Sequence, residues 1–186
     1  MAKKLCVVFP GRRYSTDRSL LYFPTQILES RGFETFLLHY DIPREVEEVE
    51  PLEENIRNAA SDALNKTSSI PFEDYEKIVF LSKSIGTLVA TNLKNFIKER
   101  TKVVHQILIT PLERTLPLIE KDDLVIVGDH DRFFPDAREK LALYPNAYVF
   151  PSFTHSLEVP GNYRLTIKTL GDICGIVESY AESLDL

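Results

Sequence analysis

Short apolar runs alternate along the chain with longer amphipathic segments. Six of these runs are dense in Val, Ile, Leu and Phe and lack a regular polar alternation. They are residues 4–10, 35–40, 77–82, 104–110, 123–128 and 147–152. Continuous apolar runs of this length are typical of strands that are covered on both faces of a sheet. The pattern therefore predicts six buried strands.

Helical patterns fill the segments between these runs. They cover residues 20–32, 49–66, 86–100, 134–144 and 164–184, and residues 111–122 have room for one short helix. Pro24 is expected near the start of the first helix, and Gly32 is expected to end it. Strands that alternate with helices imply right-handed crossovers and an α/β fold with a parallel, doubly wound sheet. No repeat or composition shift marks a boundary, so a single domain is predicted over residues 1–186.

Composition narrows the range of partners. A chain of 186 residues can bury a substantial core, and its 44% hydrophobic and 27% charged residues are typical of a soluble globular protein. The net charge of −6 gives no electrostatic basis for binding nucleic acid or an anionic membrane. The acidic stretch 44–55 carries apolar residues at helical spacing and is predicted to be a solvated helix face.

Two cysteines, Cys6 and Cys174, fall in a predicted strand and a predicted helix. They are expected to be buried thiols in a reducing compartment, because two cysteines do not make a disulfide framework. No spacing typical of metal ligands links them to the histidines, so neither a metal nor a cofactor is predicted. No apolar run has the length of a membrane span, and the N-terminal segment lacks the features of a secretory signal. A cytoplasmic location is predicted.

The residues that follow each apolar run carry the candidate chemistry, because ligands of such sheets bind beyond the carboxyl ends of the strands. Ser84 follows the third run, Asp129 and Asp131 follow the fifth, and His155 follows the sixth. Nucleophile, acid and base come in this chain order in an α/β-hydrolase. A serine hydroxyl needs a base to become a nucleophile, and the base needs a carboxylate to orient it.

The stretch "SKSIG", residues 82–86, resembles the nucleophile elbow G-x-S-x-G with Ser82 at the first glycine position. Ser84 would occupy a tight strand-to-helix turn, Gly86 would let the turn close on neighbouring backbone, and Ser82 is small enough to pack beneath it. The alternative for Ser84 is a helix N-cap. Lys83 is expected to be a partly exposed side chain that makes local contacts, because the spacing S-x-x-K of a serine–lysine pair is absent.

His155 is the predicted base. It follows an apolar run and precedes a turn-rich loop, residues 156–162, that suits a mobile catalytic group. His39 and His105 fall within or beside apolar runs and are expected to be core or edge residues. His130 lies between two aspartates and is expected to be exposed.

The motif G-x-x-D, counted from Gly128, favours Asp131 as the carboxylate partner of the base. Asp129 is then a turn residue or a helper. Phe133 and Phe134 follow directly, and they either wall an acyl pocket or pack under the loop. Phe133 is the candidate for substrate contact.

Acyl transfer also needs hydrogen-bond donors for the developing oxyanion. The backbone N–H of Ile85 is one candidate, because it follows the nucleophile at a helix N-terminus. The second is expected from Arg12 or Arg13 in the loop after the first strand, and the sequence does not choose between them. The two arginine side chains either recognise an anionic substrate, or they are solvated or paired with the plentiful acidic residues. Gly11 and Tyr14 of the same loop are candidate substrate-binding residues.

Together these residues resemble a small, lidless member of the α/β-hydrolase superfamily. The chain is similar to compact bacterial hydrolases that share an "SKSIGT" elbow (82–87), a segment like 14–23 and an "HSLE" sequence (155–158). The resemblance runs from residue 4 to about 180. The two N-terminal strands of larger hydrolases are missing, which implies a six-stranded parallel sheet of order 2-1-3-4-5-6. It also implies a minimal fold without a cap, because residues 111–122 are too few to form one.

An open, uncapped site favours simple ester or thioester hydrolysis. The predicted function is therefore a serine hydrolase that forms an acyl-enzyme, with a small-molecule ester or thioester as its partner. One alternative is a binding protein that keeps the fold without turnover, as the departures at Ser82 and Lys83 suggest. Another is a flavodoxin-like nucleotide-binding domain, although no glycine-rich phosphate loop follows any strand. The acyl group, the leaving group and the oligomeric state are left open.

Overall fold

The computed structural model describes residues 3–40, 49–99, 101 and 103–184. Six strands form one parallel sheet in the order β2-β1-β3-β4-β5-β6, so the predicted order is confirmed. The strands are β1 (Lys4–Phe9), β2 (Phe33–Leu37), β3 (Lys77–Lys83), β4 (Val104–Ile109), β5 (Leu124–Gly128) and β6 (Ala147–Phe150).

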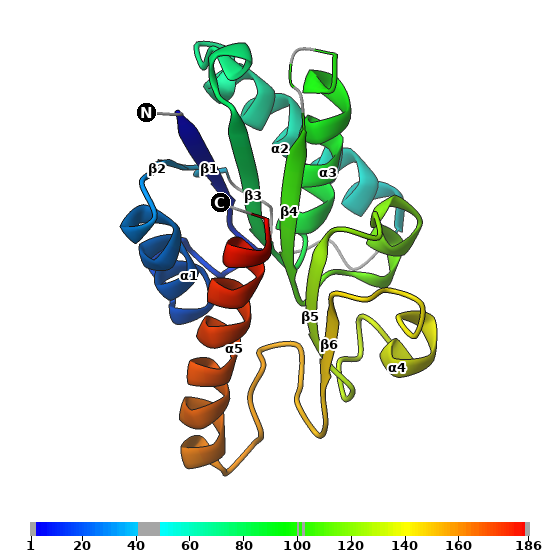
Figure 1. Cartoon of the computed structure of the whole chain (residues 1–186). Coiled ribbons are helices and arrows are strands. Elements are labelled where there is room, and N and C mark those ends of the chain that lie inside the picture. The colour runs from blue at the N-terminus through cyan, green and yellow to red at the C-terminus, as the bar shows by residue number, and fades with distance from the viewer. Residues whose placement is uncertain (1–2, 41–48, 100, 102, 185–186) are drawn as a thin grey trace.

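Helices cover both faces of this sheet. They are α1 (Ser19–Ser30), α2 (Val49–Thr67), α3 (Gly86–Ile97), α4 (Ala137–Lys140) and α5 (Tyr163–Ser183), with two 3₁₀ helices, η1 (Phe72–Asp74) and η2 (Glu113–Leu118). Figure 1 shows α1 and α5 on one face and α2 and α3 on the other. None of the helices in the described ranges is both long and apolar enough to cross a membrane.

The two covered faces explain the continuous apolar runs. Successive side chains of β1 enter different cores: Val7 and Phe9 pack on the side of α2 and α3, whereas Cys6 and Val8 pack on the side of α1 and α5. All four side chains are fully buried. Burial of an aliphatic or aromatic side chain of this size stabilises the fold by about 1.5–3 kcal/mol, so both faces of the strand have reason to be apolar.

The edge strand β2 differs from its prediction. The apolar run 35–40 places it too late, because the strand covers Phe33–Leu37. Leu38 and Tyr40 are apolar because of packing, not because they belong to the strand. Leu38 is buried in the core on the α2 side, and the Tyr40 hydroxyl donates to the Pro10 carbonyl at 2.7 Å. His39 is exposed between them, so its predicted place in the core or at its edge is wrong.

Helix boundaries also depart from the pattern. The predicted helix 134–144 shrinks to the four residues of α4, because Asp136 has a left-handed backbone (φ 56°) that ends the helix on its N-terminal side. Apolar residues around α4 serve the core instead: Phe134 and Leu141 are buried. Pro24 lies inside α1 and not near its start.

Two further expectations have mixed outcomes. Cys6 is fully buried, as predicted, and burial raises the pKa of its thiol far above the ordinary value. Cys174 is only partly buried, so the prediction of two buried thiols is wrong for this residue. The acidic stretch 44–55 lies partly outside the described residues, since residues 41–48 are not among them.

The N-terminus of α3 presses directly on the end of β1. A Cβ atom at Gly86 would lie 2.5 Å from the Pro10 carbonyl oxygen and 2.6 Å from that of Phe9. Both contacts are with backbone, which cannot move away as a flexible side chain would. This close approach requires glycine at position 86 and holds the start of α3 against the loop that follows β1.

We expect Gly86→Ala to lower the free energy of unfolding by about 1–3 kcal/mol, because an added methyl group must displace backbone. The matched control is Gly171→Ala on α5, where an added Cβ meets nothing within 4 Å. Alanine there should raise the free energy of unfolding by roughly 0.5–1 kcal/mol. Urea denaturation of the two variants measures both values, and a Gly86→Ala variant as stable as the wild type would contradict the steric argument.

Candidate active site

Ser84 occupies a strained turn between β3 and α3. Its φ angle is 55°, in the left-handed region that non-glycine residues avoid, and such a conformation costs on the order of 1–3 kcal/mol. Two residues later, at Gly86, α3 begins. Ser82, at the position of the first elbow glycine, is fully buried, and its hydroxyl donates to the Ile107 carbonyl at 3.3 Å. Serine therefore fits beneath the turn with its polar atom satisfied.

A hydroxyl, an imidazole and a carboxylate meet beside this turn. The Oγ atom of Ser84 lies 2.8 Å from Nε2 of His155, and Nδ1 of His155 lies 2.7 Å from Oδ2 of Asp131. Asp131 is buried, and its other oxygen accepts the backbone N–H of Phe133 at 2.9 Å. An ionised carboxylate only accepts hydrogen bonds. Nδ1 therefore carries the proton, and Nε2 is free to accept the proton of the serine hydroxyl.

Asp129 has a different place in the structure. One of its oxygens accepts the backbone N–H of Ser152, and the other lies 3.4 Å from the guanidinium of Arg138. These contacts hold the turn after β6. Of the two aspartates that the sequence offers, Asp131 is the one that contacts His155. His130, between them, has a largely exposed side chain.

The segment that carries His155 crosses the end of β5 at Gly128. A Cβ atom on Gly128 would lie 2.0 Å from the carbonyl oxygen of Phe153, so only glycine allows this crossing. Two backbone hydrogen bonds fasten it: Asp129 N–H donates to the Phe150 carbonyl at 2.9 Å, and His130 N–H donates to the Phe153 carbonyl at 3.0 Å. In the motif G-x-x-D, Gly128 serves only as the point from which Asp131 is counted. The structure shows that Gly128 also has a steric role.

The loop after β1 forms a tight turn beside Ser84. Arg12 and Arg13 are its central residues, and Gly11 and Tyr14 close it with reciprocal backbone hydrogen bonds of 3.0 and 3.1 Å. A Cβ atom at Gly11 would lie 3.2 Å from the Cβ of Ser84, so the turn is in contact with the elbow. The choice between Arg12 and Arg13 as an oxyanion donor stays open.

Ile85 follows Ser84 and immediately precedes α3. Its side chain is buried. Within the described part of the chain, its backbone N–H donates to no other group. A donor without an internal partner at a helix N-terminus is available to an anion. This arrangement is compatible with the predicted role of the Ile85 N–H, which stays a prediction.

Two aromatic candidates for substrate contact differ in their surroundings. The Phe133 ring packs edge-on against the imidazole of His155, with ring centroids 4.7 Å apart, and 41% of Phe133 is exposed. The Tyr14 hydroxyl accepts the backbone N–H of Leu20 at 2.9 Å, which ties this side chain to the start of α1. Phe134 is fully buried under the loop. Phe133 thus borders the site, and Phe134 supports it.

Lys83 is not the partly exposed side chain that the sequence suggested. It is 3% exposed, and its Nζ atom donates to the Thr110 hydroxyl at 3.1 Å and to the His155 carbonyl at 3.3 Å. Strand alternation is the reason. Val79 and Leu81 of β3 pack on the side of α1 and α5. Lys83 is the next residue in this alternation, and it contacts the loop that carries His155 (residues 151–162, the histidine loop).

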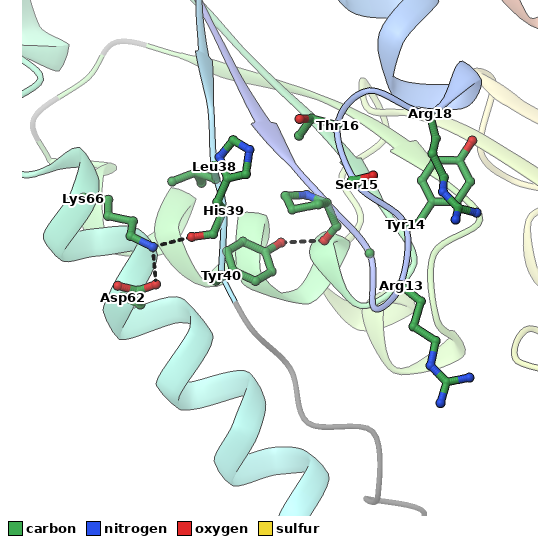
Figure 2. Close-up of a pocket in the computed structure, with 12 residues that line it drawn as sticks. Arg13, Tyr14, Ser15, Thr16, Arg18, Leu38, His39, Tyr40, Asp62 and Lys66 are labelled. Atoms are coloured by element: carbon green, nitrogen blue, oxygen red, sulfur yellow. Dashed lines mark hydrogen bonds and ion pairs between the residues drawn. The ribbon is translucent and has the colours of Figure 1, made fainter.

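A pocket of about 780 Å³ opens next to the elbow. It begins at Pro10 and Gly11, runs over the ends of β1 and β2, and reaches α2. Figure 2 shows its charged side chains: Arg13, Arg18, and the pair formed by Lys66 and Asp62. Among the described residues, no group of histidine, cysteine and carboxylate side chains is arranged to hold a metal ion.

No protein-family model and no curated protein sequence matches this chain. Solved structures do match it at low identity. A serine hydrolase without a lid from Xanthomonas campestris is 15% identical, with 97% of this chain and 84% of that one covered and a TM-score of 0.52. Est1E from Butyrivibrio proteoclasticus, with ferulic acid bound, is 14% identical, with 98% and 89% covered and a TM-score of 0.60. An esterase from Pyrococcus furiosus is 12% identical, with 96% and 83% covered and a TM-score of 0.54.

The chain has the α/β-hydrolase fold without a lid. Its topology agrees with this assignment, because the connection between β4 and β5 contains only the short helix η2, where a cap would be inserted. In the α/β-hydrolase fold, ligands bind at the carboxyl ends of the strands. Ser84, Asp131 and His155 follow β3, β5 and β6, so all three lie at that edge of the sheet.

We expect Gly128→Ala to loosen the histidine loop of this hydrolase fold, because the added methyl group overlaps the Phe153 carbonyl. Amide hydrogen exchange of Asp129 and His130 should become faster, since their N–H groups bond to the displaced segment. Gly175→Ala on α5, where an added Cβ meets no atom within 4 Å, is the control and should leave this exchange unchanged. Unchanged protection in Gly128→Ala would refute the steric role of this glycine.

Proposed function

We propose that the protein is a serine hydrolase that cleaves a carboxylic ester or thioester through an acyl-enzyme. The continuous hydrogen-bonded series from Ser84 through His155 to Asp131 carries this proposal. Each group has the partner that its role requires: a hydroxyl next to a base, and a base next to a buried carboxylate. The strained backbone of Ser84 presents the hydroxyl at the strand-to-helix turn where the α/β-hydrolase fold has its nucleophile.

The reaction follows from these contacts. His155 Nε2 takes the hydroxyl proton as Ser84 Oγ bonds to the carbonyl carbon, and Asp131 stabilises the imidazolium that forms. Backbone N–H groups of Ile85 and of the turn at Arg12 and Arg13 are the proposed donors to the oxyanion. The imidazolium returns its proton to the departing alcohol or thiol as the acyl-enzyme forms. The same imidazole then activates water, which releases the carboxylic acid and restores the serine.

Esters and thioesters are favoured over less reactive substrates because the described residues form no lid over the site. The connection at η2 is short, and Phe133 leaves one side of His155 bordered by an exposed ring. A site in contact with solvent excludes water poorly. It suits an acyl transfer in which water is itself the final acceptor.

The charge of the neighbouring pocket supports an anionic substrate. Lys66 and Asp62 pair at 2.7 Å and neutralise each other. Arg13 and Arg18 form no ion pair with a described residue, and they are two further cations among the residues that line the pocket. An ester whose distal end carries a carboxylate or phosphate fits this pocket.

The departures from the elbow motif do not favour a non-catalytic binding protein. Ser82 packs without displacing the turn, and its hydroxyl has a partner in β4. The Lys83 amine contacts the Thr110 hydroxyl, the His155 carbonyl and the Tyr14 ring, so its contacts among the described residues do not include the Ser84 hydroxyl. A nucleotide-binding function likewise gains no support, because the chain has no glycine-rich phosphate loop.

Ser84→Ala should abolish hydrolysis of a short-chain aryl ester and labelling by a fluorophosphonate probe, because it removes the nucleophile. Circular dichroism provides the control that the variant is folded. Ser82→Ala is the matched comparison: it removes a neighbouring hydroxyl and should keep both labelling and turnover. A wild-type protein that neither hydrolyses the ester nor reacts with the probe would contradict the proposed function.

Replacement of the two aspartates by asparagine separates their roles. Asp131→Asn should lower kcat roughly 10³- to 10⁴-fold, because the amide no longer holds the productive tautomer of His155. Asp129→Asn should reduce kcat by less than about tenfold, since that side chain only supports the turn at Ser152. Steady-state kinetics on the same aryl ester decides the comparison, and equal losses in the two variants would contradict the assignment.

Paired substrates test the charge of the pocket. An aryl hemisuccinate carries a carboxylate, whereas the aryl butyrate is neutral. The ratio of their kcat/KM values, hemisuccinate over butyrate, should fall roughly tenfold in Arg18→Ala, because a guanidinium–carboxylate contact is worth about 1.5–3 kcal/mol. Lys168→Ala, which removes an exposed cation on α5, is the control and should keep the wild-type ratio. A ratio that Arg18→Ala leaves unchanged would exclude this arginine from substrate selection.

A further inference from the structure

Lys83 places a buried amine next to the candidate site, in contact with the backbone of His155. Only 3% of the residue is exposed, although a lysine keeps its amine in water almost everywhere in proteins. The amine has three contacts: the Thr110 hydroxyl at 3.1 Å, the His155 carbonyl at 3.3 Å and the face of the Tyr14 ring at 4.6 Å. One of these is the backbone of the predicted base itself.

We propose that Lys83 is a positioning residue for His155. The ammonium group of Lys83 holds the histidine loop through its hydrogen bond to the His155 carbonyl, and its positive charge biases the protonation of the imidazole. The inference deepens the proposed hydrolase function and rests on it. Lys83 does not touch the reacting atoms in this proposal. It acts through the predicted base, whose backbone carbonyl it contacts.

The His155 carbonyl lies in the loop between Phe153 and Leu157, whose side chains are buried in the core on the side of α1 and α5. After the crossing at Gly128, the loop is closed by hydrogen bonds between Thr154, Leu157 and Glu158, all of them within the loop. No backbone N–H within the described ranges donates to the His155 carbonyl. The Lys83 ammonium therefore supplies the bond that joins this carbonyl to the rigid end of β3.

Three charged groups act on the Lys83 amine. Asp131 at the end of β5 and Glu158 in the histidine loop attract it, whereas Arg18 before α1 repels it. Burial lowers the pKa of Lys83 from 10.5 to about 8, and the two carboxylates act against this shift. The amine is thus mostly protonated at neutral pH. The amine therefore places a positive charge against the His155 carbonyl, and a cation at that position opposes the formation of a second cation nearby.

The effect of Lys83 on the free energy of unfolding helps to distinguish a positioning role from a side chain that only fills space. The lowered pKa of Lys83 means that the unfolded chain binds this proton more tightly than the folded chain does. The charged amine therefore lowers stability below pH 8, and that penalty is relieved as the pH rises from about 8 to 10.5. An uncharged side chain of similar length removes the penalty. If Lys83 only filled space, its replacement would be harmless to activity.

The test compares Lys83→Met, Lys83→Gln and Lys83→Arg with wild type on a short-chain aryl ester. Lys83→Met removes both the donor and the charge, Lys83→Gln keeps a donor without charge, and Lys83→Arg keeps the charge. Lys94→Met is the matched control, because Lys94 is another mostly buried lysine that pairs with Glu120 and Asp123 before the start of β5. Its loss should leave the kinetics unchanged.

For Lys83→Met we expect kcat to fall roughly 10- to 100-fold with little change in KM, as for a misplaced catalytic group. The acidic limb of the kcat/KM profile should move upward by roughly half to one pH unit in the Met and Gln variants, because the loss of a positive charge favours the imidazolium. Lys83→Arg should keep the wild-type limb. The urea midpoint of Lys83→Met should equal or exceed that of wild type.

Two outcomes would overturn the inference. An active wild type with an unchanged kcat and an unchanged acidic limb in both neutral variants refutes it, while the hydrolase function stands. An inactive wild type that also resists the fluorophosphonate probe refutes the proposed function, and the role of Lys83 falls with it. If Lys83→Met does not fold, the decisive comparison is between Lys83→Gln and Lys83→Arg, in the position of the acidic limb of their kcat/KM profiles.

Discussion

The backbone contact between the start of α3 and the end of β1 is the constraint on which the site depends. At Gly86 the helix lies so close to the Phe9 and Pro10 carbonyls that no side chain fits. This contact fixes the strained turn at Ser84, whose left-handed backbone would otherwise relax at a gain of about 1–3 kcal/mol. It also brings the turn after β1 alongside the nucleophile. One steric contact therefore positions both the Ser84 turn and the loop after β1 that lies against it.

A second contact of the same kind positions the segment that carries His155. Gly128 lets the segment after β6 cross the end of β5, and two backbone hydrogen bonds secure that crossing. Beyond it, the loop depends on side chains: Asp131 fixes the imidazole, and Lys83 reaches the His155 carbonyl. Ser84 thus lies at a strand-to-helix junction, whereas His155 lies in a loop that is held by the buried side chains of Phe153 and Leu157 and by a few polar contacts. Small changes in those contacts should affect the base first.

Much of the fold could be predicted because its sheet is covered on both faces. Continuous apolar runs marked the six strands, and the residues after them included Ser84, Asp131 and His155, which the structure brings into hydrogen-bonding contact. The failures have a common cause, which is that apolar character does not reveal what a residue packs against. Leu38 and Tyr40 looked like strand residues, yet they pack beyond the end of β2. Phe134 and Leu141 looked helical, yet only four residues between them form α4.

The burial of Lys83 was not predicted from the sequence. Charge predicts exposure, but strand alternation directs the residue before Ser84 into the interior on the side of α1 and α5. A buried amine with neutral partners is unfavourable, as its lowered pKa shows. Thr110, Tyr14 and the His155 carbonyl offset only part of that penalty, because none of them carries a full negative charge. Methionine could fill the same space without any penalty. A charge that the fold tolerates at a cost, directly behind the group proposed to move the proton, is better explained by the chemistry of the site than by the stability of the core.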